Sequence, residues 1–179
     1  MTRLPILLAC LFLALFAAAC GGDDDEQETA ATPEPTAEAT AEAPGEIDPS
    51  AISKDLSEKP AFDMPEGSPP AELVSEDIVK GKGKAAKAGD TVSMQYVGNF
   101  WSSGEEFDAS WNAGQPIEFP LGAGRVIPGW DQGIAGMKEG GRRLLVIPPE
   151  LGYGPDGFPP VIGPNETLVF VVDLEKVKG

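Results

Sequence analysis

The chain has 179 residues, a length that predicts one folded domain with room for an appendage, and carries 13 Lys and Arg against 29 Asp and Glu, a formal net charge of −16. It contains no histidine, which excludes serine–histidine and cysteine–histidine nucleophile pairs, histidine-ligated zinc and an imidazole base. The acidic balance argues against a nucleic-acid partner, because phosphate backbones are bound by clustered Lys and Arg.

Residues 1–19 have the pattern of a secretory signal peptide. A single charge, at Arg3, precedes the apolar run Leu4–Ala19. A membrane-spanning helix is the alternative, but it needs roughly 20 apolar residues and this run is shorter. The small residues Ala17–Ala19 directly before Cys20 resemble the lipobox of bacterial lipoproteins, although Ala17 stands where leucine is usual.

The lipobox resemblance implies that the signal is cut before Cys20 and that this cysteine receives a lipid, palmitate included. The protein would then be extracytoplasmic and anchored to the cell membrane. Plain secretion, with Cys20 an incidental thiol, is the alternative. Cys10 lies inside the segment that would be removed, so the mature chain would keep one cysteine and form no intramolecular disulfide.

Residues 20–60 differ in composition from the rest of the chain. They are rich in Asp, Glu, Ala, Thr and Pro, and almost no large apolar side chain occurs between Cys20 and Ile47. Without burial to offset the entropy cost of ordering, such a segment predicts a disordered, self-repelling tether. An acidic cation-binding tail is the alternative, but the acidic residues lack a fixed ligand spacing.

Residues 61–179 have the composition and periodicity of a folded domain. Alternating apolar and polar side chains predict strands over 91–96, 117–121 and 168–175. Arg143–Ile147 predicts a buried strand, and Leu73–Val79 predicts a further strand from a weaker pattern.

One segment, Pro128–Met137, has a helical pattern. Pro128 suits a first helical turn, and Trp130, Ile134 and Met137 share one face. Its three glycines make it a poor isolated helix, so a sheet must pack over the apolar face. The fold class is therefore α+β, a curved antiparallel β-sheet wrapped around one short α-helix. The long loop Pro148–Asn165 carries apolar side chains that we expect to fold over a groove.

Six spaced motifs follow one another between about Gly81 and Val177. They are Val92–Gly98, Gly104–Ser110, Val126–Gly133, Gly140–Arg143, Ile147–Gly154 and Ile162–Phe170. Any one alone is weak, but in this order and spacing they resemble the FKBP-type peptidyl-prolyl cis-trans isomerases. The resemblance implies a half-barrel sheet around a short helix, with the active cleft between them.

The same resemblance implies roles for individual residues. Trp130 would form the floor of the pocket, Asp108 and Tyr153 would supply polar groups, and the Ile127 N–H would donate to the bound peptide. Val161 and Ile162 would close one wall. The residues assigned to catalysis are Asp108, Tyr153, Phe107 and Trp130, and those assigned to substrate binding are Tyr96, Ile117, Val126, Ile127, Phe158, Val161, Ile162 and Phe170.

Three positions depart from the family pattern. Ile117 replaces a second pocket aromatic, Ala113 a basic residue that often pairs with the pocket aspartate, and Phe158 a frequent loop histidine. Asp108 is therefore expected to lack a cationic neighbour, and the departures leave the binding of macrolide inhibitors open.

The function implied is rotation of X–Pro bonds in exported proteins, with proline-containing segments as partners and the membrane contacted through Cys20. This chemistry needs no cofactor and no metal, and it tolerates the missing histidine because no proton is transferred. We expect a monomer. The alternative is a membrane-tethered peptide-binding or chaperone module with little isomerase activity, because Ile117, Ala113 and Phe158 all alter the cleft.

Overall fold

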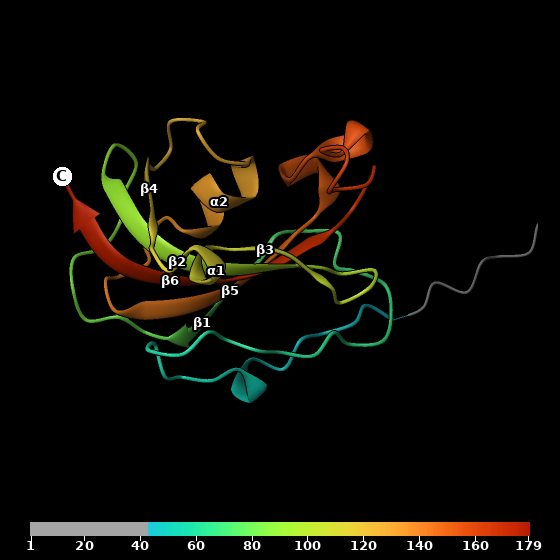
Figure 1. Cartoon of the computed structure of the whole chain (residues 1–179), viewed down its shortest axis with the longest axis horizontal. Helices are drawn as coiled ribbons and strands as arrows, with labels where there is room; N and C mark the ends of the chain where they lie inside the picture. Colours follow the sequence, from blue (N-terminus) through green and yellow to red (C-terminus); the bar gives the residue numbers. More distant parts are fainter. Residues whose placement is uncertain (1–42) are drawn as a thin grey trace, which may run out of the picture. The chain divides into compact units, whose positions relative to one another are not determined.

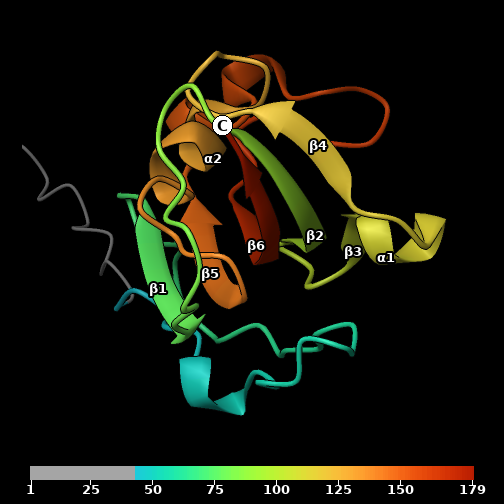
Figure 2. The ribbon, with the colours of Figure 1, turned by 90° about the vertical axis from the view of Figure 1, so that its left-hand side faces the viewer.

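The computed structural model describes residues 43–179, and its centre is one curved antiparallel sheet (Figures 1 and 2). The strands run in the order β1-β5-β6-β2-β3, and β4 also pairs with β2. Their bounds are β1 Val74–Val79, β2 Thr91–Phe100, β3 Glu106–Ala109, β4 Ile117–Pro120, β5 Gly141–Ile147 and β6 Leu168–Lys178. All pairings among these six strands are antiparallel, which confirms the fold class expected from the sequence.

Helix α2, Pro128–Gly133, lies across one face of the sheet (Figure 1). It is shorter than the predicted helix over 128–137, because the chain turns at Gly136 with a φ of +79°. Trp130, Ile134 and Met137 are nevertheless buried together, as predicted. Gly129 permits close approach to β5, since a Cβ there would lie 2.5 Å from the Ile147 Cγ2.

The edge of the sheet beside β2 is made of two short strands. Strand β4 pairs with the first part of β2 and β3 with the last part, and the helix α1, Ser110–Ala113, interrupts the edge between them. The sequence analysis did not predict β3, which has four residues and therefore too little alternation to detect. Three 3₁₀ turns complete the elements, at Pro49–Ala51, Pro149–Leu151 and Gly154–Asp156.

Residues 43–70 cover the face of the sheet opposite helix α2 (Figures 1 and 2). Ile47 and Ile52 are 5% and 1% exposed and pack in one cluster with Val169 and Val171 of β6. The prediction of a disordered tether is therefore wrong for residues 43–60, because a few apolar anchors suffice when a sheet face is available. The rest of the predicted tether and the predicted signal, including Cys20, lie outside the described residues.

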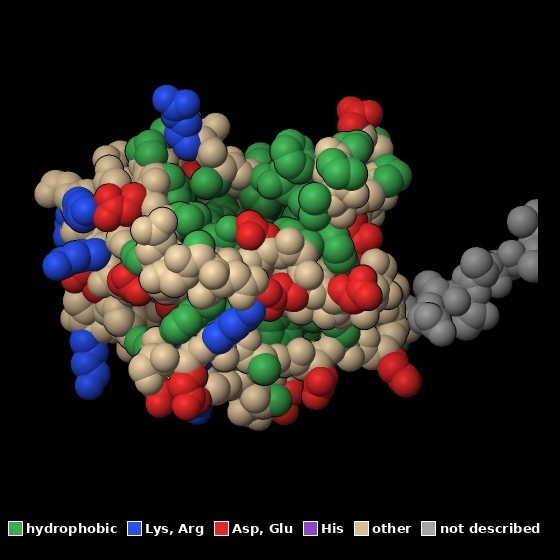
Figure 3. All heavy atoms as spheres, viewed as in Figure 1, with side chains coloured by type: hydrophobic (Ala, Val, Ile, Leu, Met, Phe, Trp, Pro, Cys, Tyr) green, Lys and Arg blue, Asp and Glu red, His purple; other side chains and the backbone are tan. Residues whose placement is uncertain are grey.

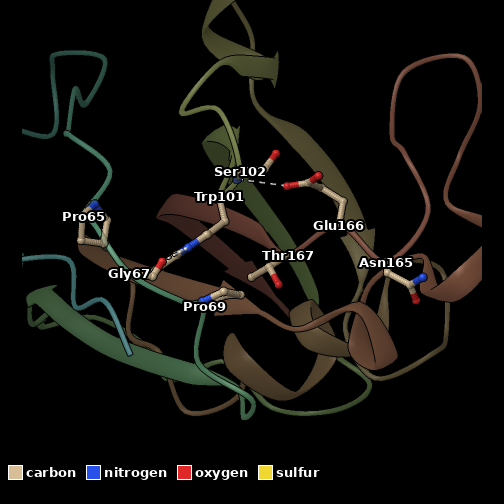
Figure 4. A pocket seen from close by; sticks show the side chains of 8 residues that line it. All are labelled: Pro65, Gly67, Pro69, Trp101, Ser102, Asn165, Glu166 and Thr167. Carbon is tan, nitrogen blue, oxygen red and sulfur yellow. Dashed lines mark hydrogen bonds between the residues drawn. The ribbon is translucent and has the colours of Figure 1, made fainter. Parts of the chain in front are cut away.

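Trp101, at the end of β2, joins this covering segment to the sheet (Figure 4). Its indole Nε1 donates to the Gly67 carbonyl at 3.3 Å, and its ring is 8% exposed. Next to it, the Ser102 N–H donates to the Glu166 carboxylate at 3.2 Å, so the end of β2 is held against the chain that enters β6.

Arg142 of β5 makes a second attachment and has no exposed surface. Its Nε and Nη2 donate to the Asp173 carboxylate at 2.6 and 2.7 Å, a bidentate pair between neighbouring strands. The remaining donors reach the Ser53 carbonyl at 2.6 Å and the Glu58 carbonyl at 2.9 Å. One side chain therefore ties the covering segment to the sheet.

Within residues 43–179, we find no helix that combines the length and the apolar composition needed to cross a bilayer.

Candidate functional site

A pocket of about 200 Å³ opens between helix α2, strands β3 and β4, and the chain around Tyr153. In the space-filling view, hydrophobic side chains gather in a hollow between α2 and the segment that carries the last two 3₁₀ turns (Figure 3). The pocket is lined by Tyr96, Phe107, Asp108, Ile117, Arg125, Val126, Ile127, Trp130, Tyr153 and Phe170. The fold therefore brings together nine of the twelve residues that the sequence analysis assigned to catalysis and binding.

Aromatic rings build the walls of the pocket. Trp130 is 4% exposed, and its ring centroid lies 5.1 Å from that of Tyr96 and 5.2 Å from that of Phe170, both edge to face. Phe107 meets Phe170 in the same way at 5.6 Å. Such edge-to-face contacts hold each ring in place, so the pocket is a preformed apolar cavity.

Gly98 of β2 makes the packing of two of these rings possible. A Cβ at this position would lie 2.7 Å from the Phe170 Cε1 and 2.8 Å from the Phe107 Cζ. Gly98 pairs with Phe170 on one side and with Asp108 on the other. A missing side chain on β2 therefore sets where these two rings stand.

The Asp108 carboxylate lies at the mouth of the pocket, where it is exposed and accepts a hydrogen bond from the Tyr96 hydroxyl. The sequence analysis expected Asp108 to lack a cationic neighbour because Ala113 replaces a basic residue, and the structure places a tyrosine hydroxyl against the carboxylate. Burial raises the pKa of Tyr96 above its usual value near 10, and the hydrogen bond and negative charge of Asp108 raise it further. Tyr96 is therefore a neutral donor throughout the physiological range.

Two further donors at the pocket have no acceptor within residues 43–179: the backbone N–H of Ile127 and the hydroxyl of Tyr153. Burial raises the pKa of Tyr153 above its usual value near 10, and the charge of Asp108 adds to the rise. Both groups are available to a bound peptide carbonyl.

The loop that leads into α2 is held by Asp131 in the first turn of that helix. Its carboxylate accepts hydrogen bonds from the N–H of Gly122 at 2.8 Å and of Gly124 at 3.0 Å. Both glycines have positive φ, +73° and +64°, which other residues rarely adopt. Asp131 thereby fixes the pocket wall formed by Val126 and Ile127.

Three predicted binding residues do not line the pocket. Phe158 and Val161 are 59% and 51% exposed, and the Phe158 ring lies 5.5 Å from that of Tyr153. Ile162 is 5% exposed and packs in the core cluster that includes Trp130. Phe158 therefore contacts the exposed ring of Tyr153, while Ile162 anchors this loop to the core.

The structure adds Arg125, which the sequence analysis missed. Arg125 directly precedes Val126 and Ile127, and this position beside a pocket motif could have predicted that it lines the pocket. The residue type alone could not, since an isolated arginine in a Gly-rich loop is ordinary for an exposed turn.

A larger hollow of about 430 Å³ lies at the other end of β2, around Trp101 and Glu166 (Figure 4). Trp101 is its one aromatic lining residue, and that ring is already engaged with Gly67. Size alone therefore does not identify the site, whereas the smaller pocket combines aromatic walls with unpaired donors.

The arrangement suits a small apolar ring with an adjoining amide. The aromatic walls exclude water, while Ile127 and Tyr153 can hold carbonyl oxygens of an extended or turned peptide. The Asp108 carboxylate is oriented by the Tyr96 hydroxyl at the mouth of the pocket. In the described part of the chain, no group of three or more Cys, Asp or Glu side chains is arranged to hold a metal ion.

Comparison with known proteins places this geometry in a family. Residues 82–175 match the sequence model described as FKBP-type peptidyl-prolyl cis-trans isomerase. A protein of Streptomyces anulatus named FK506-binding protein is 59% identical over 121 residues, which cover 67% of this chain and 98% of that protein.

Two solved structures extend the comparison. The crystal structure of AtFKBP13 is 39% identical with a TM-score of 0.56, and the match covers 62% of this chain and 95% of that one. The crystal structure of FkpA from Escherichia coli is 40% identical with a TM-score of 0.55, covering 72% of this chain and 52% of that one.

Proposed function

The chain belongs to the family of FKBP-type peptidyl-prolyl cis-trans isomerases and accelerates rotation about X–Pro bonds, and from this premise we propose that it acts on exported proteins from a lipid anchor in the membrane. The aromatic pocket is the observation that supports the isomerase activity. The N-terminal sequence is the observation that supports the membrane anchor.

Rotation about an X–Pro bond breaks no covalent bond and transfers no proton. The barrier of about 18–20 kcal/mol comes from amide resonance, which a twisted amide loses. The twisted amide also has less negative charge on its oxygen, so apolar aromatic surroundings favour it relative to water. A site that binds this state better than the planar forms lowers the barrier. The rings around Trp130 supply these surroundings, and the Ile127 N–H and Tyr153 hydroxyl hold the peptide in position.

The pH dependence of turnover follows from the groups that titrate. Both pocket tyrosines have a raised pKa, so their hydroxyls stay protonated well above neutrality, and the chain has no histidine. We expect kcat/KM for a proline peptide to stay nearly flat between pH 6 and 8 at constant ionic strength, measured by a protease-free assay. A bell-shaped profile in this window would contradict a mechanism without proton transfer.

Gly98→Ala tests whether catalysis requires the positions of the Phe107 and Phe170 rings that the absence of a side chain at residue 98 permits. The new methyl group would overlap Phe107 and Phe170, so we expect a stability loss of about 1–3 kcal/mol and a decrease of kcat/KM of about tenfold. Denaturant unfolding and turnover on the folded variant measure the two effects. Gly163→Ala is the control, because nothing lies within 4 Å of a Cβ there. An unchanged kcat/KM in the Gly98 variant would refute this role.

Membrane anchoring is supported by the order of features in the sequence. The apolar run Leu4–Ala19 ends in small residues directly before Cys20, and an acidic, proline-containing segment follows. Residues 21–42, which the sequence analysis assigns to the tether, would reach at most about 75 Å at full extension. The isomerase domain would then work close to the membrane surface, where exported chains emerge.

Two single substitutions test the anchor. The full chain is produced in a bacterium fed with a palmitate analogue that can be tagged, and label and membrane association are followed. We expect Cys20→Ser to lose both the label and the membrane association. Cys10→Ser is the matched control, because Cys10 lies in the removed segment, and it should keep both. If the wild type carries no more label than Cys20→Ser, Cys20 bears no lipid, and plain secretion replaces the lipid anchor.

A chaperone contribution is the second candidate, favoured by the exposed side chains of Phe158 and Val161 beside the pocket. Suppression of aggregation of a proline-free client separates it from isomerisation. We propose that the protein works as a monomer on single peptide segments, which sedimentation of the chain without residues 1–20 would test.

A further inference from the structure

Arg125 is a free positive charge at the mouth of the pocket. The residue lines the pocket and is exposed. No hydrogen bond or ion pair joins its guanidinium to another residue between 43 and 179. A guanidinium stays charged at any physiological pH, and it suits planar carboxylates, which it binds with two parallel hydrogen bonds.

The backbone that carries Arg125 is held in place. The Asp131 carboxylate binds the N–H of Gly124 on one side, and Val126 and Ile127 on the other side are packed against the core cluster. The base of the side chain therefore has a fixed position at the rim, while its end is free to meet a ligand.

The carboxylates close to this loop are already engaged. Asp108 accepts the hydroxyl of Tyr96, and both oxygens of Asp131 accept backbone N–H groups. Arg125 therefore has no internal acidic partner, although acidic residues greatly outnumber basic ones in the chain.

The size of the pocket limits what Arg125 can contact. A cavity of about 200 Å³ accepts one proline ring and part of its amide, so the neighbouring substrate residues lie at the rim. Successive residues of an extended peptide are spaced by about 3.3–3.6 Å, which puts the side chains flanking the proline within reach of an arginine on the lip.

We propose that Arg125 determines substrate specificity by selecting X–Pro segments with an acidic residue next to the proline. The inference rests on the isomerase function and names its preferred substrate class. The net charge of −16 and the Asp108 carboxylate disfavour acidic segments, and Arg125 supplies a positive charge at the same pocket that opposes this repulsion. Exposed ion pairs of this kind predict a preference of about two- to fivefold at low ionic strength, and salt weakens it.

The test compares peptides that differ only beside the proline, with Glu, Gln or Lys before it and, in a second set, after it. Isomerisation is measured by NMR exchange, so that no protease specificity enters. The wild type is expected to prefer Glu over Gln by about two- to fivefold in at least one set, mainly through KM, and to lose the preference at 1 M salt. Arg125→Gln should bring the ratio of kcat/KM for the Glu peptide to that for the Gln peptide to about one. Arg125→Glu should lower this ratio below one and make the Lys peptide the preferred substrate.

Lys80→Gln is the control, since it removes the same charge from an exposed residue outside the pocket and should leave the ratio unchanged. An equal Glu-to-Gln ratio in the wild type and Arg125→Gln, or a change of the same size in Lys80→Gln, would overturn the proposal. Failure of the wild type to isomerise even the Gln peptides would instead overturn the isomerase function on which the proposal rests.

Discussion

Arg142→Met is expected to lower the free energy of unfolding by about 3–5 kcal/mol, the range found when one partner of a buried ion pair is removed. Arg142 is fully buried, and its loss leaves the Asp173 carboxylate without its bidentate partner. The carbonyls of Ser53 and Glu58 lose their donors as well, so the covering segment loses its attachment to β5. Urea unfolding followed by tryptophan fluorescence measures the change.

Lys178→Met is the matched control, because it breaks an exposed pair with Glu118 and should cost no more than about 1 kcal/mol. The double variant Arg142→Met, Asp173→Leu should recover much of the loss, since no buried charge remains unpaired. An effect of Arg142→Met no larger than that of Lys178→Met would show that the buried pair does not hold the domain together.

The loss in Arg142→Met should also depend on pH. Burial raises the pKa of Asp173, and Arg142 opposes this rise. Without Arg142, the folded-state pKa of Asp173 rises further above its unfolded value, so the folded state binds the proton more tightly. Stability of the variant therefore falls as pH rises from the unfolded-state pKa of Asp173 through its raised folded-state pKa, so the loss is smaller at acidic pH than at neutral pH. A loss that is constant from pH 5 to 8 would rule out Asp173 as its source.

Trp130→Ala is expected to reduce kcat/KM at least about a hundredfold, whereas Tyr153→Phe should cost less than about tenfold. Trp130 contacts the rings of Tyr96, Phe119 and Phe170, so its removal opens the pocket floor and lowers stability by about 3–5 kcal/mol. Tyr153→Phe keeps the ring and removes one neutral hydrogen bond to the substrate, worth about 0.5–1.5 kcal/mol. The order of the two effects shows whether the aromatic cavity contributes more to catalysis than the Tyr153 hydrogen bond does.

Trp130→Phe separates folding from catalysis, because it keeps an aromatic floor and removes an indole N–H that has no partner in residues 43–179. We expect this variant to fold and to retain more activity than Trp130→Ala. Turnover is compared at a temperature where circular dichroism finds all variants folded. A larger loss in Tyr153→Phe than in either Trp130 variant would mean that the hydroxyl, not the cavity, carries catalysis.

Much of the site followed from the sequence because spaced motifs carry it. Tyr96, Phe107 and Trp130 stand in such motifs, and the structure places all three in the pocket wall. Phe158 and Val161 were assigned to the pocket from the same resemblance, yet both are exposed and neither lines the pocket. Their direction depends on how one long loop folds back on itself, which alternation and spacing do not encode.

For residues 43–60, amino-acid composition led to the wrong prediction, a disordered tether. Residues 43–60 contain few apolar side chains, and by themselves could not offset the entropy of ordering. In the folded chain, Ile47 and Ile52 are buried because Val169 and Val171 of β6 present an apolar second face. Whether such a segment orders depends on a surface made by residues more than a hundred positions away.

The sequence by itself determined five of the six strands, the short helix and the family, because alternation, helical spacing and ordered motifs are local properties of the chain. Tertiary structure alone decided that the second face of the sheet is covered, that Arg142 is buried, and that Arg125 stands unpaired at the pocket mouth. Burial and pairing depend on which segments distant in the sequence come into contact, and local sequence patterns do not specify those contacts.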